Sequence, residues 1–490
     1  MPETSNYIST LTRDYFSRLC DENHFSEFLS NTLREDEQAG FITISLPFDK
    51  VDPLAVLETY GNSDDFQYYW EHPNSGLAIA AGEALHICRH YGSSRFSKLR
   101  REVSKLEQQV HSYSEIPHSL AGMNVFGGAS FFDKPLSGVW SSFGNSSFIL
   151  PGWTVIRDGK FSLLTLGLQV TDNDDPDTLI DKAEAKLRHF TDTLSDQLDQ
   201  SVVLNGTTDA ALTLTADNSP AFRNRWEENV AHAKDLIDQN VFEKIVMARE
   251  ERLHTDGRAN PTRLLHHLRT DYPDCFSFLY QVNGQAAFVG CTPEKLLSIE
   301  SDRLYTDGLA GSISRGKTAT QDEILSRKLL SSGKDLREHQ FVVDYILEKL
   351  EDYSVEIDVP DQPGIRKYAN VQHLHTPITA SLNHATDVMA LLEKMHPTPA
   401  VGGYPQDRAL PYIQELEQIE RGWYAGPIGW MNRNGRSEFS VAIRSGLIQP
   451  NKVRFYAGCG IVKGSDPEAE WRETELKLLP MLNALRHAAE

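Results

Sequence analysis

The stretch "YAGPIGWMNRNGRSEFSVAIRSGLI" (residues 424–448) indicates the fold class more directly than any other part of the chain. Two runs rich in apolar residues lie on either side of the dipeptide Asn434-Gly435. Asn-Gly is preferred in tight β-hairpin turns because both residues tolerate a positive φ. We therefore expect two antiparallel strands here and an antiparallel sheet in this half of the chain.

The rest of the sequence mixes strand and helix patterns without regular strand-helix-strand units. Apolar residues alternate or run together in some segments and recur at helical spacing in others. Strands are predicted at 41–48, 161–170, 243–253, 275–282, 286–291, 303–312 and 453–462, and helices at 93–113, within 171–198, at 221–239 and 334–352, and from Pro261 and Asp466 onward. The sequence predicts an α/β (α+β) fold in which large antiparallel sheets are flanked by helices.

The segment 205–221, "NGTTDAALTLTADNSPA", is the best candidate for a boundary because it is rich in Gly, Asn, Asp, Ser and Thr. It divides the chain into residues 1–215, an N-terminal half, and residues 216–490, where the candidate chemistry is concentrated. The segment is also compatible with a surface loop between two halves that share one core.

Charge and composition narrow the classes of partner. With 69 acidic and 48 basic residues, the net charge is −21, which disfavours binding to nucleic acids or anionic membranes. The five cysteines are odd in number and widely spaced, which argues against a disulfide framework. We expect a cytoplasmic protein, since no signal pattern or long apolar span is visible. A small anionic substrate would need local positive charge.

The C-terminal segment "SDPEAEWRETELKLLPML" (465–482) places acidic residues in a pattern that suits a metal. Asp466 can cap a helix, so Glu470, Glu473 and Lys477 fall on one face. Two neighbouring carboxylates repel each other unless a cation lies between them, and their hard oxygens suit Mg²⁺. A solvated charged face would give the same pattern.

Glu338 is the second candidate metal ligand. In "SGKDLREHQFVVDYILEKL" (332–350) it shares an apolar helix stripe with Phe341, Val342 and Tyr345. A carboxylate on such a face is costly unless it is paired or bound to a metal. The alternative is a buried salt bridge to a residue nearby in sequence, Arg337 or Lys334.

Lys244 and Glu294 are candidates for proton transfer. Lys244 precedes the apolar run 245–248, and desolvation of its amine would suit a general base. Glu294 follows a Thr-Pro pair after an apolar strand, where a partly buried carboxyl group could act as a general acid. The simpler interpretations are a lysine at a strand end whose amine reaches solvent and a glutamate at the start of a helix.

Three glycine-containing segments could present backbone N–H groups to an anion. They are "DGLAGS" (307–312), "HPTPAVGG" (396–403) and "YAGCGIV" (456–462). Arg444 could grip a carboxylate with two hydrogen bonds. His373, considered alone, is more often structural than catalytic.

Together these segments resemble the chorismate-utilising enzymes, a family that includes isochorismate, salicylate, anthranilate and aminodeoxychorismate synthases. The resemblance is dense over residues 221–485 and loose before them. It is carried by "KIVMAR", "TPEKLL", "DGLAGSISRG", "SGKDLREHQFVVD", "VQHLHTPI", "HPTPAVGG", "YAGPIGW", "SEFSVAIRSGLI" and "YAGCGIVKGSDPEAEWRETELKL". It implies a large α/β unit built on antiparallel sheets, with the active site between its halves.

The resemblance also implies roles for the candidate residues. Lys244 would activate the nucleophile, and Glu294 would protonate the departing hydroxyl group. Glu338, Glu470 and Glu473 would surround Mg²⁺, with the division of direct contacts between Glu470 and Glu473 left open. Substrate binding would fall to Gly311, Ser312, His373, Ala400, Val401, Arg444, Lys477 and the N–H groups near Gly458 and Gly460.

The identity of residue 400 bears on the reaction type. Family members that eliminate pyruvate resemble one another in having threonine at the position of Ala400, whereas isochorismate synthases carry a small aliphatic pair such as Ala400-Val401. Ala310 stands where the aminodeoxychorismate branch often has a lysine. No candidate glutaminase nucleophile is visible, so no glutaminase partner is expected and water is the implied nucleophile.

The resemblance thus implies a Mg²⁺-dependent isochorismate synthase that converts chorismate to isochorismate. Salicylate synthase, an anthranilate or aminodeoxychorismate synthase-like component, and a non-catalytic chorismate- or metal-binding regulator remain as alternatives. The long N-terminal half favours menaquinone biosynthesis over a siderophore or salicylate route. The sequence does not choose between a monomer and a homodimer.

Overall fold

The computed structural model describes residues 7–36, 38–61, 65–203, 213–216, 220–368, 371–383, 386–417 and 419–489. Its helices are α1 (Tyr7–Asp21), α2 (His24–Glu35), α3 (Pro53–Tyr60), α4 (Arg95–Gln109), α5 (Pro176–Val203), α6 (Pro220–Asp238), α7 (Pro261–Asp271), α8 (Ala319–Leu330), α9 (Gly333–Leu350), α10 (Val388–Met395), α11 (Gln406–Leu416) and α12 (Pro467–Ala489). In the part of the chain described, no helix is both long and apolar enough to span a membrane.

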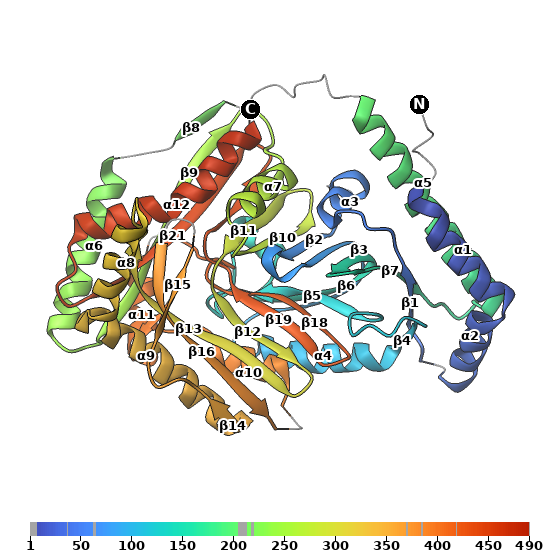
Figure 1. Cartoon of the computed structure of the whole chain (residues 1–490), viewed down its shortest axis with the longest axis horizontal. Helices are drawn as coiled ribbons and strands as arrows, with labels where there is room; N and C mark the ends of the chain where they lie inside the picture. Colours follow the sequence, from blue (N-terminus) through green and yellow to red (C-terminus); the bar gives the residue numbers. More distant parts are fainter. Residues whose placement is uncertain are drawn as a thin grey trace.

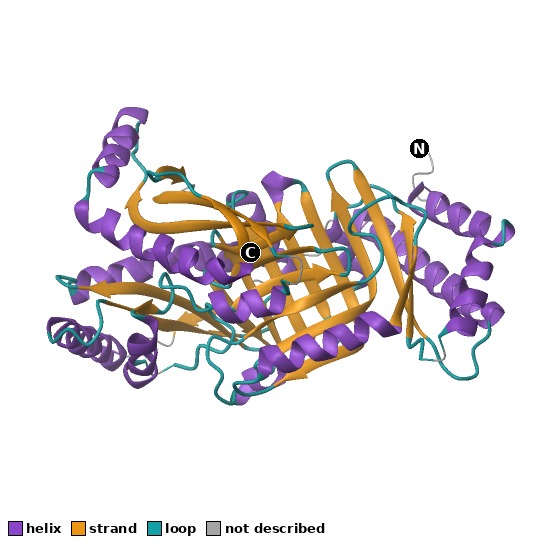
Figure 2. Ribbon diagram, turned by 90° about the horizontal axis from the view of Figure 1, so that it is seen from below, coloured by secondary structure: helices purple, strands orange, loops and turns teal. Residues whose placement is uncertain are grey.

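The strands of the first half are β1 (Phe41–Pro47), β2 (Gln67–His72), β3 (Leu77–His90), β4 (Val110–Tyr113), β5 (Asn124–Ala129), β6 (Ser146–Asp158) and β7 (Phe161–Gln169). The later strands are β8 (Leu214–Ala216), β9 (Lys244–Thr255), β10 (Phe276–Asn283), β11 (Ala286–Thr292), β12 (Lys295–Glu300), β13 (Arg303–Ser314), β14 (Ser354–Asp358), β15 (Gly364–Lys367), β16 (Val371–Leu382), β17 (Gly403–Tyr404), β18 (Pro427–Asn432), β19 (Arg436–Val441), β20 (Ser445–Gln449) and β21 (Lys452–Val462). Strands occupy the centre of the molecule, and helices lie outside them (Figures 1 and 2).

The predicted fold class is confirmed. Among the described strands every pairing is antiparallel except that of β1 with β4. Strands β18 and β19 form the expected hairpin, with Met431 opposite Ser437 and Asn434-Gly435 in its turn. Gly435 has a φ of 76°, which is the positive φ that a tight hairpin turn needs.

The two halves of the chain share their sheet. Strand β2 pairs with β10, and β5 pairs with β18, so strands from before and after residue 215 are hydrogen-bonded neighbours. Along β2, Tyr68 and Trp70 belong to one apolar core, while Tyr69 between them belongs to a second core on the opposite face. The division at residue 215 stays a prediction, and most of segment 205–221 lies outside the described residues.

The helix beginnings follow from local capping. Asp466 accepts a hydrogen bond of 2.9 Å from the Ala469 N–H and caps α12, as the sequence predicts. Asn260 caps α7 in the same way, with Pro261 in its first turn. The predicted helix 93–113 is too long, because its last residues leave α4 and form β4 against β1.

Two of the three glycine-containing segments lie in strands, as predicted for residues 303–312 and 453–462. "YAGCGIV" lies in β21, paired with β9, and "DGLAGS" lies in β13, paired with β16. The register of β13 shifts between Ala310 and Ser312, so Gly311 sits in a β-bulge with a φ of 72°. A glycine suits this bulge because a side chain there would be strained.

Candidate active site

A single cavity of about 260 Å³ is lined by every residue that the sequence selected for a site. These residues are Lys244, Glu294, Gly311, Ser312, Glu338, His373, Ala400, Val401, Arg444, Gly458, Gly460, Glu470, Glu473 and Lys477. They come from β9, β13, α9, β16, β21, α12 and the connections around β11, α10 and β19. The fold thus brings together side chains that are far apart in the sequence.

An ion pair between Lys244 and Glu338 lies in this cavity. The Lys244 Nζ, on the first residue of β9, is 2.7 Å from Oε1 of Glu338 on α9. The Lys244 ammonium lowers the pKa of Glu338 against the opposing effect of burial. The sequence suggested Arg337 or Lys334 as partners for Glu338, and this was wrong because the fold brings Lys244, at the start of β9, within 2.7 Å of Glu338.

The pair also explains one glycine. A Cβ atom on Gly460 would lie 2.9 Å from Cε of Lys244 and 3.7 Å from Oε1 of Glu338. Strand β21 carries Gly460 directly beside β9, with Val462 opposite Lys244. A side chain at this position would therefore displace the lysine. The backbone contact with substrate inferred for Gly460 stays a prediction.

Glu294 lies between β11 and β12, which corrects the alternative of a glutamate at a helix start. Burial raises the pKa of Glu294 to about 7, while Lys244 and a hydrogen bond from Thr398 oppose the shift. The Thr398 hydroxyl donates to Oε1 of Glu294 over 3.4 Å. Glu294 can therefore hold a proton near neutral pH, as a general acid must.

Glu470 and Glu473 project from α12 into the same cavity. Burial raises the pKa of Glu470, and the charge of Glu473 adds to this effect. Glu473 is also paired with Lys477 at 2.7 Å. With Glu338, these side chains give three carboxylates that face one cavity. Mg²⁺ takes one or two carboxylates and keeps several waters, so this oxygen donor set fits it.

Cationic and neutral donors line the remaining wall. Arg444 has a φ of 47°, and in the part of the chain described its guanidinium makes no hydrogen bond or ion pair with protein. Its charge lowers the pKa of Glu294, though less than other neighbours do. An unpaired guanidinium in a cavity is suited to a carboxylate ligand. Lys477 donates to the carbonyl oxygen of Gly458 over 2.9 Å.

His373 is a neutral donor or acceptor in this wall. Its Nδ1 lies 2.7 Å from the Ser312 hydroxyl, and its Nε2 is buried without a hydrogen-bond partner. Burial lowers the pKa of His373 to about 3, so the imidazole is uncharged at neutral pH. The expectation that His373 lies beside a bound ring stays a prediction.

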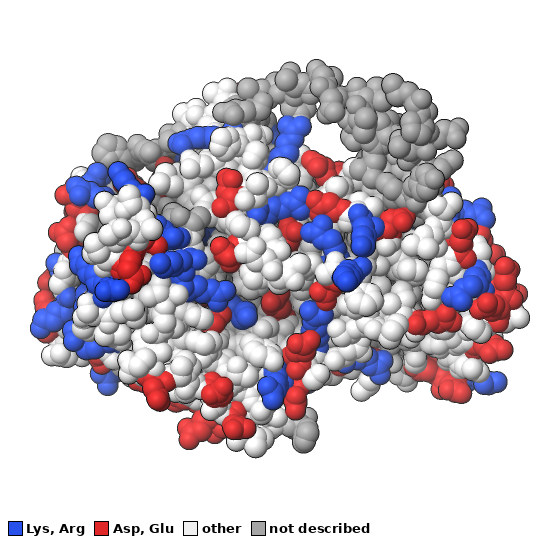
Figure 3. All heavy atoms as spheres, in the orientation of Figure 1, with Lys and Arg blue, Asp and Glu red and all other residues white. Residues whose placement is uncertain are grey.

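Lys and Arg side chains gather on the outer face over α8 and β15, despite the net charge of −21 (Figure 3).

Comparison with known proteins identifies the family. The sequence model described as "Chorismate binding enzyme" matches residues 27–486. The chain belongs to the chorismate-binding enzyme family. Its sequence is 37% identical over 443 residues to the salicylate biosynthesis isochorismate synthase of Pseudomonas aeruginosa, covering 89% of each chain.

Two further relatives extend this identification over nearly the whole chain. The isochorismate synthase MenF of Bacillus subtilis is 33% identical over 92% of this chain and 95% of its own. The structure of MenF, the menaquinone-specific isochorismate synthase of Escherichia coli, superposes with a TM-score of 0.74. That match covers 95% of this chain and 99% of the other, at 27% identity. The predicted family and fold are confirmed.

The sequence did not reveal Arg421, which fixes the segment 396–403, the turn between α10 and β17 that we call the corner. Arg421 donates to the carbonyl oxygens of Val401, over 2.9 Å, and Val246, over 2.8 Å. It also pairs with Glu417, which accepts a hydrogen bond from the Ala248 N–H. The corner is thereby tied to β9, the strand that carries Lys244. The i, i+4 spacing of Glu417 and Arg421 was the available signal, but it predicts an exposed helix pair.

Other residues of the cavity were also missed as site residues. Lys334 and Asp335 enter from the first turn of α9, and Tyr424 enters just before β18. Burial raises the pKa of Tyr424 well above its usual value, so the phenol stays neutral. Lys334 was considered only as a partner for Glu338. The charge of Lys334 still lowers the pKa of Glu338, after that of Lys244.

The buried pair gives a stability prediction. The side chains of Arg421 and Glu417 are 1% and 2% exposed. Arg421→Met should lower the free energy of unfolding by about 3–5 kcal/mol, because it leaves Glu417 buried without its cation. The measurement is urea unfolding followed by tryptophan fluorescence.

The double variant Arg421→Met/Glu417→Leu is the matched control. It removes both charges, so it should recover part of the lost stability. A single variant as stable as the parent, or a double variant less stable than Arg421→Met, would contradict a structural role for the pair.

Proposed function

We propose that this chain is an isochorismate synthase, which converts chorismate to isochorismate with Mg²⁺ and without ammonia or a glutaminase partner. One observation carries the proposal. The amine of Lys244 and the carboxyl group of Glu294, whose pKa is raised to about 7, face one cavity that also holds three carboxylates. The relatives named above support it, because each of them is an isochorismate synthase.

The proposed reaction exchanges one hydroxyl group for another. Lys244 takes a proton from water as the water oxygen bonds to C2 of the chorismate ring. The ring double bonds shift, the C4–O bond breaks, and Glu294 gives its proton to the departing hydroxyl group. One water enters and one water leaves, so the step is balanced and reversible. Arg444 and Lys477 are placed to bind the substrate carboxylates.

Mg²⁺, held by Glu338, Glu470 and Glu473, would neutralise the charge of the ring carboxylate. Without it, three protein carboxylates and a dianionic substrate would meet in one cavity. Glu338 is shared between the proposed metal site and Lys244.

The corner 396–403 argues against pyruvate elimination. Ala400 and Val401 line the cavity and supply no hydroxyl group to orient the enolpyruvyl side chain. The nearest hydroxyl of the corner belongs to Thr398, which is engaged with Glu294. We therefore favour release of isochorismate over a salicylate synthase. We assign the product to menaquinone biosynthesis, the route for which the Escherichia coli MenF is specific; the Pseudomonas relative is named for salicylate biosynthesis.

Substitution of the base tests the proposal. Lys244→Ala should reduce turnover of chorismate at least about 10³-fold, because it removes the proposed base, while Lys477 is engaged with Glu473 and the Gly458 carbonyl group. Thermal unfolding should show a folded protein, since Glu338 can reach solvent. The assay is incubation with chorismate and Mg²⁺ without ammonia, with chromatographic identification of every product.

Lys463→Ala, at an exposed position after β21, is the matched control and should keep parental activity. Normal turnover by Lys244→Ala would remove the assigned role of Lys244. Pyruvate formed by the parent as fast as chorismate disappears would replace the proposed activity by that of a salicylate synthase.

The carboxyl group of Glu294 gives a pH prediction. Because its pKa is raised to about 7, it keeps its proton below that pH and loses it above. The kcat/KM for chorismate should therefore fall as pH rises through about 7. Thr398→Val removes a donor that stabilises the carboxylate, so the fall should move to higher pH.

Thr379→Val, on β16 outside the cavity, is the control and should leave the pH profile unchanged. A parental profile that stays flat through neutrality, or one that Thr398→Val moves to lower pH, would contradict the assignment of Glu294 as the acid.

A further inference from the structure

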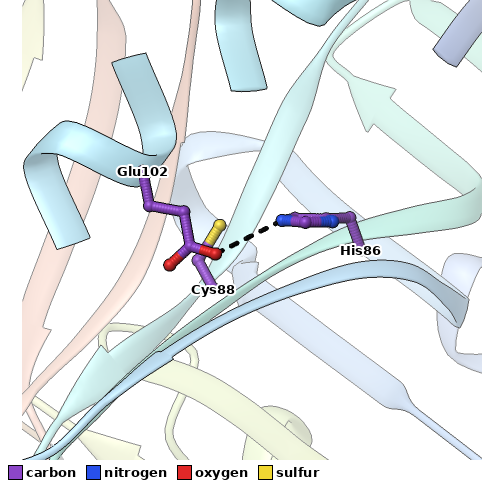
Figure 4. Close-up of side chains that lie close together, drawn as sticks. All are labelled: His86, Cys88 and Glu102. Atoms are coloured by element: carbon purple, nitrogen blue, oxygen red, sulfur yellow. Dashed lines mark ion pairs between the residues drawn. The ribbon is translucent and has the colours of Figure 1, made fainter. Parts of the chain in front are cut away.

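A second group of metal-binding side chains lies outside the active-site cavity. His86, Cys88 and His90 occupy alternate positions near the end of β3, so they point to one face of the strand. Glu102 projects toward that face from α4 (Figure 4). The ligand atoms of His86, Cys88 and Glu102 all lie within 4.8 Å of one another. Among the described residues, this is the only trio of His, Cys, Asp or Glu that meets this criterion.

The carboxylate of Glu102 is held between the two histidines. Its Oε1 lies 3.5 Å from Nε2 of His86, and its Oε2 lies 2.6 Å from Nε2 of His90. The contact between His90 and Glu102 does not have hydrogen-bond geometry. The Nε2 atom of His90 is therefore buried without a hydrogen-bond partner. Within the described chain, Glu102 has no Lys or Arg as an ion-pair partner. The cluster therefore contains a carboxyl group without a Lys or Arg partner and an imidazole nitrogen without a hydrogen-bond partner.

We propose that β3 and α4 form a second metal site, for Zn²⁺ or a closely related divalent transition metal. An imidazole nitrogen, a thiolate sulfur and a carboxylate oxygen are the donors that Zn²⁺ binds, with water or a fourth side chain completing the tetrahedron. His86, Cys88 and Glu102 supply these donors, and His90 orients the carboxylate or takes the fourth position. Mg²⁺ prefers oxygen ligands, so the two sites select different metals.

The position of this site indicates a structural role. Helix α4 packs against both β3 and α10, so it connects the two. Arg100 on α4 pairs with Asp387, the residue that caps α10, at 3.4 Å. Helix α10 leads directly into the corner 396–403 of the cavity. A metal that joins β3 to α4 would fix the support of that corner. None of the four proposed ligands lines the cavity itself.

A cobalt titration tests the site independently of catalysis. The full-length protein, reduced and metal-free, is titrated with Co²⁺ in the presence of excess Mg²⁺, which occupies the oxygen-rich site. Thiolate coordination gives a sulfur-to-cobalt charge-transfer absorption in the near ultraviolet. We expect one equivalent of Co²⁺ to develop this absorption and one equivalent of Zn²⁺ to abolish it. Zn²⁺ should also raise the midpoint of thermal unfolding.

Variants assign the ligands. Cys88→Ser should remove the charge-transfer absorption, and His86→Ala and Glu102→Gln should weaken Co²⁺ binding by more than about 100-fold. His90→Ala should weaken it by about 10–100-fold if it only orients Glu102. Cys20→Ser removes the one half-exposed thiol among the cysteines and is the matched control, which should bind as the parent does.

Two results would overturn the proposal. One is a parent protein that develops no charge-transfer absorption with Co²⁺, which would leave the cluster as a carboxylate held between two histidines. The other is an unchanged absorption in both Cys88→Ser and Glu102→Gln, which would place the metal elsewhere. Glu102 is partly exposed, so Glu102→Gln remains informative if Cys88→Ser, at a fully buried position, fails to fold. Loss of this site would leave the assignment of Lys244 and Glu294 untouched.

Discussion

The site depends on a buried ammonium and a carboxylate that must be close enough to neutralise each other. Lys244 and Glu338 are 2.7 Å apart on a strand and a helix that meet at the cavity. A buried charge without a partner costs several kcal/mol, so Glu338, which is itself partly exposed, makes the buried position of the Lys244 ammonium tolerable. Gly460 leaves the space that the lysine occupies. The antiparallel pairing of β9 with β21 fixes these three residues relative to one another.

The other charges of the cavity follow from this pair. Glu294 shares the cavity with Lys244 but is not its ion-pair partner, so burial raises the pKa of its carboxyl group to about 7. One carboxylate therefore stays charged beside the amine while another stays protonated. This difference allows two glutamates in one cavity to serve different purposes. Glu470 and Glu473 repel each other, and a divalent cation would relieve that repulsion.

Local signals in the sequence predicted local structure well. The Asn-Gly turn, the Asp466 cap and the strand patterns of β9, β10 and β21 reflect interactions between near neighbours, and the structure contains each of them. Partners distant in the sequence were less accessible. Glu338 was matched with nearby cations because helix spacing gives no information on a strand 94 residues away. The residues of the cavity were assigned together through the family resemblance, because the family's motifs mark positions that its fold brings into one site.

Arg421 and Gly311 show what such reasoning omits. Arg421 acts by donating to backbone carbonyl groups of two separate segments, and backbone acceptors carry no mark in the sequence. Gly311 lies within the predicted strand 303–312, but the sequence pattern did not show that the strand has a bulge at this residue. The cluster on β3 was overlooked for a similar reason. Its histidines and cysteine are visible as alternating residues, but Glu102 joins them only through the packing of α4.

The central claim is that Lys244 activates a solvent water that becomes the new hydroxyl group at C2, while Glu294 protonates the hydroxyl group that leaves C4. Isotope labelling measures this directly. In water enriched in ¹⁸O, with Mg²⁺, mass spectrometry of early product should show one heavy oxygen per isochorismate, located at C2. Product that retains the original C4 oxygen of chorismate at C2 would mean that the hydroxyl group migrates within the substrate, and would contradict the account.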